Sequence, residues 1–158
     1  MRILGVDPGI GITGFSIIDS KKNRTSLLAY GTIRPMPKDR LPKSLNYLFE
    51  EVNKILDQFS PDVLAIEDAF YSNNVKSAMI LGQARGSIIL AASQADILIY
   101  EFAPRKVKMS VCGNGAASKE QVSYMVTKIL KLEKAPKPLD VSDAMAVGLC
   151  YINQSRNL

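Results

Sequence analysis

Short apolar runs punctuate the chain and predict a set of buried strands. Residues 3–6, 63–66 and 97–100 are each a short apolar run, which is typical of a strand in the centre of a sheet. Two more strands are indicated by the loose alternation of 11–19 and by the Thr, Tyr and Ile residues of 25–33. Because the first three strands are close in sequence, we expect a meander of hairpins.

Helical periodicity fills most of the remaining chain. Apolar residues recur every three or four positions over 41–59, as on one face of an amphipathic helix. Ser118 and Gln121 have the spacing of a capping box, which marks the start of a helix. The segments that we expect to be helical are 41–59, 75–93, a short one over 105–110 after Pro104, 119–131 and 140–153.

Without the short helix, the predicted order of elements is βββ-α-β-α-β-α-α. Three antiparallel strands followed by alternating helices and strands imply an α/β fold, with a mixed five-stranded sheet flanked by helices. A length of 158 residues fits one domain, and residues 1–158 contain no repeat, low-complexity stretch or domain boundary.

The sequence predicts a cytoplasmic protein without a membrane segment. Every apolar run is shorter than the roughly 18 residues of a transmembrane helix, and the acid at position 7 comes too early for a signal peptide. Two cysteines, Cys112 and Cys150, make no disulfide framework, which suits a reducing compartment.

The absence of histidine narrows the possible chemistry. It excludes histidine-based triads, His-rich zinc sites and an imidazole general base. Twenty Lys and Arg against fifteen Asp and Glu give a net charge of +5, which suits nucleic acid or an anionic membrane, although a merely soluble basic protein has the same balance. Catalysis would need carboxylates, Lys, Ser, Tyr, Cys or an oxygen-bound cation.

Four acids stand out by their positions. Asp7 and Glu67 each directly follow an apolar run, and the carboxyl ends of parallel strands share the sheet edge where α/β proteins form ligand sites. Asp140 and Asp143 lie three residues apart, on one face of the last predicted helix. Plainer explanations are strand exits into solvent for the first two, and a helix cap or first-turn charge for the others. Asp68 follows Glu67 and therefore points to the opposite side of the strand, so we leave it out of the predicted site.

Converging carboxylates would repel one another unless cations lay between them. Ligands that are all oxygen favour Mg²⁺, with Mn²⁺ as a substitute. Two such ions about 3.5–4 Å apart can clamp a phosphodiester for in-line hydrolysis, one activating water and the other stabilising the leaving 3′ oxygen. This mechanism needs no histidine.

Several segments together resemble, in order and spacing, the RuvC family of bacterial Holliday-junction endonucleases. They are GVDPG (5–9) with TGF (13–15), AIEDAF (65–70), LGQARG (81–86), GNGAASK (113–119) and DVSDA (140–144). The resemblance covers essentially the whole chain. It implies a ribonuclease-H-like fold, a homodimer, and paired symmetric nicks in four-way DNA junctions during recombination and DNA repair.

The same resemblance implies the site and its partners. Asp7, Glu67, Asp140 and Asp143 take the family's catalytic, metal-binding positions, with Mg²⁺ as the implied cofactor. The chemistry of the site leads us to expect two ions in each active site. Some relatives carry histidine where this chain has Asp140, so the all-carboxylate version applies. The implied partner is the RuvA–RuvB branch-migration complex.

DNA contacts are expected around these acids. Phe70, with Tyr71 beside it, is placed to stack on an unpaired base, and its alternative role is core packing. We expect phosphate contacts from basic residues, of which family position favours the last two: Arg85, Arg105, Lys106, Lys108 and Lys119. A solvated basic face describes Lys128 and the lysines after it better.

Small residues at steps of four in the second predicted helix form a smooth groove. Ala78, Gly82 and Gly86 occupy these steps, and each helical glycine costs about 1 kcal/mol relative to alanine. We hypothesise a dimer contact here. Close packing against the protein's own sheet is the alternative.

Three rival functions remain open. The glycine-rich segment from Asp7 to Gly14 is also similar to the phosphate loop of the actin, hexokinase and Hsp70 superfamily, whose members need a second, duplicated domain. A junction-binding module without catalysis would explain the basic charge but not the four acids. A ribonuclease-H-like nuclease acting on another nucleic acid, such as RNA, would share the site chemistry.

Overall fold

The computed structural model describes residues 1–22, 24–69 and 73–156. Phe70 and Tyr71, the two expected base-stacking residues, lie outside these ranges. The strands in the described part are β1 (Arg2–Asp7), β2 (Thr13–Lys21), β3 (Arg24–Ile33), β4 (Val63–Glu67) and β5 (Leu98–Phe102). Its helices are α1 (Leu41–Phe59), α2 (Val75–Gln94), α3 (Pro104–Cys112), α4 (Lys119–Ile129) and α5 (Leu139–Ser155).

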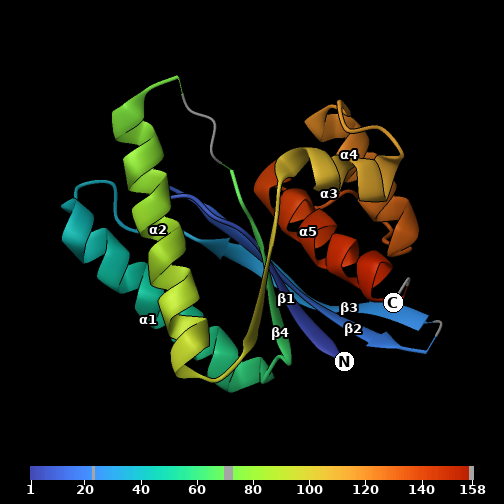
Figure 1. Ribbon diagram of the computed structural model, residues 1–158, viewed down its shortest axis with the longest axis horizontal. Helices are drawn as coiled ribbons and strands as arrows, with labels where there is room; N and C mark the ends of the chain where they lie inside the picture. Colours follow the sequence, from blue (N-terminus) through green and yellow to red (C-terminus); the bar gives the residue numbers. More distant parts are fainter. Residues whose placement is uncertain (23, 70–72, 157–158) are drawn as a thin grey trace.

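The strands form one mixed sheet in the order β3-β2-β1-β4-β5. β2 pairs antiparallel with both β1 and β3, whereas β4 pairs parallel with both β1 and β5. Helices α1 and α2 cover one face of the sheet, and α3, α4 and α5 cover the other (Figure 1). Because strand side chains alternate, each face contributes to a separate core. Val63 and Ala65 belong to the α5 side. Leu64 and Ile66 belong to the α1–α2 side.

The predicted α/β fold with a mixed five-stranded sheet is confirmed. The helix expected over 41–59 has those bounds, and both hydrogen bonds of the Ser118–Gln121 capping box are present. The order of elements differs after β5, where three helices follow, because the short segment at 105–110 belongs to the complete helix α3. Among the described helices, none is long and apolar enough to cross a membrane.

Helix α5 packs closely on the sheet because two glycines leave room for its backbone. A Cβ on Gly5 would overlap the carbonyl oxygen of Ala144, and a Cβ on Gly14 would overlap that of Asp140. Ser16, which pairs with Gly5 in the sheet, donates a hydrogen bond of 3.2 Å to the Ala144 carbonyl. These contacts hold the first turn of α5 beside the end of β1.

Candidate active site

Asp7 and Glu67 lie next to each other at one edge of the sheet. β1 and β4 are parallel with Val6 aligned to Ile66, so the residue after each is at the same level. Alternation along β4 places Glu67 on the same face as Ala65, which α5 covers. The two acids therefore meet under the start of α5.

Asp140 and Asp143 come to the same place from the first turn of α5. Gly14 is the sheet partner of Asp7 and also contacts the backbone of Asp140. Helix α5 is preceded by Pro138 at its N-cap, and no side chain caps it. The suggestion that Asp140 is merely a helix cap is therefore wrong, because Asp140 lies within the first turn of the helix.

Burial and nearby negative charges raise the pKa of three of these carboxyl groups, those of Asp7, Glu67 and Asp143. Burial raises the pKa of Asp7 to about 8, and the negative charges of Glu67 and Asp143 add to this effect. Burial also raises the pKa of Glu67, as does the charge of Asp143, while Lys119 and a hydrogen bond from Asp7 act against the rise. A bound cation would relieve this repulsion.

Lys119 already places one positive charge beside these acids. The Lys119 Nζ lies 3.1 Å from Oδ2 of Asp143, with the two side chains 59% and 15% exposed. Burial raises the pKa of Asp143, and Lys119 only partly counteracts it. Burial lowers the pKa of Lys119, but the charge of Asp143 and their hydrogen bond outweigh this, so that its pKa is raised overall.

The donor set suits a hard divalent cation. All four acids offer carboxylate oxygens, the ligands that Mg²⁺ and Mn²⁺ prefer over softer metals. Within the described residues, however, no three His, Cys, Asp or Glu side chains are grouped as ligands of one ion. The donors thus fit the metal, and their side chains must rearrange before they can bind it together.

The predicted basic residues differ in how close they are to the acids. The charge of Lys108 lowers the pKa of both Glu67 and Asp143, so it faces the site together with Lys119. Lys106 instead lies over the ring of Phe102, 5.4 Å from its centroid. Arg105 is exposed beside Gly115, whose added Cβ would be 2.6 Å from the Arg105 Cγ. Lys108 and Lys119 are the pair that the structure brings to the acids.

The structure places Arg85, one of the residues predicted to contact DNA, in ion pairs with two acids, and its DNA contact stays a prediction. Its side chain is only 12% exposed and forms an ion pair of 2.9 Å with Asp68. It also forms an ion pair with Glu101 on β5. Arg85 therefore ties α2 to the end of β4 and to β5. The same contact confirms that Asp68 lies apart from the four acids.

The glycines of α2 do not pack against the protein's own sheet. Gly82 and Gly86 are exposed, and nothing lies within 4 Å of a Cβ built on either, while Ala78 is half-buried. The buried residues of this helix are Ala84, Ile88, Ala91 and Ala92. Close packing on the sheet is therefore wrong as the explanation of these glycines, and the dimer contact stays a prediction.

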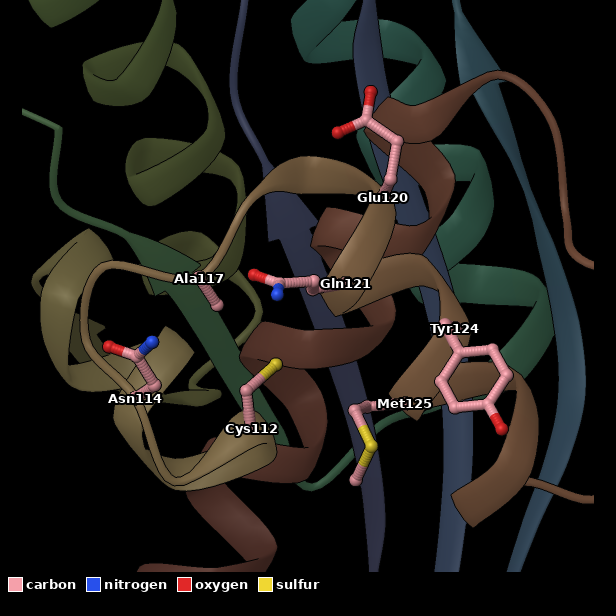
Figure 2. A pocket seen from close by; sticks show the side chains of 7 residues that line it. All are labelled: Cys112, Asn114, Ala117, Glu120, Gln121, Tyr124 and Met125. Atoms are coloured by element: carbon pink, nitrogen blue, oxygen red, sulfur yellow. The ribbon is translucent and has the colours of Figure 1, made fainter.

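A separate cavity of about 440 Å³ lies beside α4 (Figure 2). It is lined by residues from the end of α3, the following loop and α4, namely Cys112, Asn114, Ala117, Glu120, Gln121, Tyr124 and Met125. Glu120 is its single acid, and burial raises the pKa of the Cys112 thiol, which makes that thiol a poor nucleophile at neutral pH. This cavity does not contain the acid cluster.

Sequence reasoning missed two supports of the site. One is Gly14, whose contact with Asp140 is described above. The other is a hydrogen bond of 3.0 Å from the Ser142 hydroxyl to that of Ser123, both buried between α5 and α4. Ser142 precedes Asp143, so this bond fixes α4 against α5 at the acid site. The sequence signal for this hydrogen bond was Ser142, a polar residue on a helix face that is otherwise apolar.

Comparisons with known proteins agree with this architecture. The family model described as crossover junction endodeoxyribonuclease RuvC matches residues 3–151. A protein of that name from Finegoldia magna is 46% identical over 156 residues, which is 99% of this chain and 95% of the relative. One from Thermotoga petrophila is 46% identical over 158 residues, covering 99% and 94%.

Solved structures give the same result. The Thermus thermophilus RuvC in complex with Holliday junction substrate has a TM-score of 0.93 and 30% sequence identity, covering 99% of this chain and 96% of that one. Thermus thermophilus RuvC in a second structure has a TM-score of 0.89 at the same identity and coverage. With the family model, the sequence identities and the fold in agreement, the chain belongs to the RuvC family of crossover junction endodeoxyribonucleases.

Proposed function

We propose that this protein resolves four-way (Holliday) DNA junctions by paired symmetric nicks, in homologous recombination and DNA repair. The observation that carries the proposal is the meeting of Asp7, Glu67, Asp140 and Asp143 at one end of the sheet, in a chain of this family. The Thermus thermophilus relative has been solved with a Holliday junction, which supports the same substrate here.

The four acids are the proposed metal ligands and catalytic residues. Asp7 and Glu67 come from neighbouring strands and Asp140 and Asp143 from one helix turn, so they can surround ions from two sides. Mg²⁺ is the proposed cofactor, two per site with Mn²⁺ as a substitute, and it would activate water and stabilise the leaving oxygen. The chain's own part is to hold these carboxylates together at a partly buried edge of the sheet, where their mutual repulsion is relieved by a bound cation.

Lys108 and Lys119 are the proposed phosphate contacts nearest the cut. Both act electrostatically on the acids, so a phosphate at the acids would lie within reach of their ammonium groups. Arg105 and Lys106 would extend this basic surface along α3. Phe70 and Tyr71 keep their proposed stacking role on family position alone. Such contacts weaken as salt rises.

Two copies of the chain would provide the paired nicks. A stripe of exposed positions along α2 offers apolar side chains and bare backbone, in the order Val75, Met79, Gly82, Gly86 and Leu90. Exposed apolar patches on a helix with bare glycines suit close contact with another helix. We propose that this stripe forms the homodimer, and that the RuvA–RuvB complex delivers the junction.

The test is cleavage of a synthetic four-way junction in Mg²⁺, with EDTA and plain duplex as controls. We expect symmetric, ligatable nicks in the junction alone. Cutting of RNA hybrids in place of the junction would be consistent with the proposed metal chemistry, but it would show that the proposed substrate is wrong.

The Glu67→Gln variant distinguishes a junction-cleaving enzyme from a protein that only binds junctions. The substitution keeps the size of the side chain and removes its charge, so cleavage should fall more than about 100-fold, beyond the effect of losing an outer-shell partner. Junction binding, measured by gel shift in Ca²⁺ or EDTA, should persist. A variant that cuts at the normal rate would refute the assignment of the acids.

A further inference from the structure

Lys119 occupies a position that a helix alone does not favour. It is the first residue of α4, directly after the Ser118 cap, where the helix dipole is positive and an acid is preferred. Its ammonium group reaches Asp143 of α5 at 3.1 Å, and its charge also acts on Asp7 and Glu67. The acid cluster, and not the helix, accounts for this lysine.

Two features hold the contact in place. The capping box fixes where α4 begins, because Ser118 Oγ accepts a hydrogen bond of 3.1 Å from the Gln121 amide and Gln121 Oε1 accepts one of 2.8 Å from the Ser118 amide. One turn after Lys119, the buried hydroxyl of Ser123 accepts the bond from Ser142. The packing of α4 on α5 therefore keeps the backbone of Lys119 near that of Asp143, within reach of the lysine side chain.

The contact conflicts with metal binding by the same carboxylate. Asp143 has one oxygen turned to the lysine, and the acids in the described part of the chain are not grouped as ligands of one ion. A cation and an ammonium group cannot share one oxygen at close range without strong repulsion. For Asp143 to bind a metal ion through this oxygen, Lys119 has to leave it.

We propose that Lys119 is the internal counter-cation of the metal site, which holds Asp143 until divalent ions displace it. The inference rests on the proposed function, because it takes the four acids as the metal ligands. Lys119 is then a positioning residue in the DNA-free protein. Once displaced, its ammonium group is free for the phosphate of the incoming DNA, so that metal binding and DNA binding assist each other.

The test is Mn²⁺ binding to the DNA-free full chain, by calorimetry and by the electron paramagnetic resonance of free Mn²⁺. Lys119→Met keeps the length of the side chain without its charge, and should bind Mn²⁺ about five-fold more tightly than the unaltered protein. Lys119→Arg restores the ion pair and should return the affinity to the original value. Lys108→Met is the matched control, because it removes an equal charge that also acts on Glu67 and Asp143, whereas the ion pair described for Asp143 is with Lys119.

Equal gains from Lys119→Met and Lys108→Met would overturn the proposal, because the effect would then be that of net charge alone. A weaker affinity in Lys119→Met would overturn it as well. Junction cleavage by the unaltered protein is measured in parallel. If the protein cleaves junctions but Lys119→Met gains no affinity, the counter-cation role is wrong and the function stands. If Mn²⁺ affinities follow the expected order without any cleavage, the function is wrong.

Discussion

At the scale of one residue, Asp7 shows that the arrangement of the site lowers the stability of the fold. Its carboxyl group is placed in a partly buried position beside Glu67 and near Asp143, so ionisation is costly and burial raises its pKa to about 8. Clustering these acids lowers the stability of the metal-free fold, but it is the arrangement that binding of a cation requires. Repulsion that destabilises the metal-free protein becomes attraction when a cation binds.

This repulsion predicts how stability depends on pH in metal-free protein. Between the ordinary pKa of 3.8 and about 8, folded Asp7 holds a proton that the unfolded chain has released. The free energy of unfolding should therefore fall as pH rises through this window. Asp7→Asn imitates the protonated form, so it should unfold at higher temperature than the unaltered protein at pH 9 and nearly equally at pH 4.

The measurement is thermal unfolding in chelator from pH 4 to pH 9. Two curves that stay parallel over the whole range would show that Asp7 ionises as freely as in water. Saturating Mg²⁺ should raise the unfolding temperature of the unaltered protein at pH 8 and leave that of Asp7→Asn nearly unchanged.

At the scale of elements, the packing of α5 on β1 and β2 sets the site. Gly14→Ala would place a Cβ against the Asp140 carbonyl, which is backbone and cannot turn away. We expect a loss of about 1–3 kcal/mol in the free energy of unfolding, typical of overpacking. The shift of α5 should lower cleavage by a larger factor than the loss of folded protein explains.

Gly11→Ala is the matched control, because Gly11 is exposed and nothing lies within 4 Å of a Cβ built there. It should change the free energy of unfolding by less than about 0.5 kcal/mol. Urea unfolding and junction cleavage measure both effects. A Gly14→Ala protein that is as stable and active as Gly11→Ala would show that α5 is free to move.

The sequence was sufficient where local patterns decide the structure. Periodicity defined α1 to the residue, and apolar runs followed by an acid found Asp7 and Glu67. Strand β5 instead extends to Phe102 because that residue pairs with Glu67 on β4, which a local pattern does not record. The ion pair of Arg85 with Asp68 was equally hidden, because it depends on how α2 lies across the sheet.

At the scale of the whole molecule, the exposed stripe on α2 predicts association. Gly86→Gln would place a long side chain on bare backbone, so sedimentation at micromolar concentration should change from dimer to monomer. The isolated chain should not lose stability, since glycine is the poorer helix former by about 1 kcal/mol.

Lys76→Gln is the control for this variant, on the same helix one residue past the exposed Val75. It should sediment as the unaltered protein does. A Gly86→Gln protein that remains dimeric would place the interface elsewhere on the molecule.

The two cores on opposite faces of the sheet have an evolutionary consequence. The acids and lysines of the proposed chemistry lie on the side of α3, α4 and α5, whereas the exposed stripe belongs to α2 on the other side (Figure 1). Substitutions in well-separated parts of a protein combine almost independently. In the proposed homodimer, a lineage can therefore alter how two copies recognise each other while selection keeps the proposed cleavage chemistry constant.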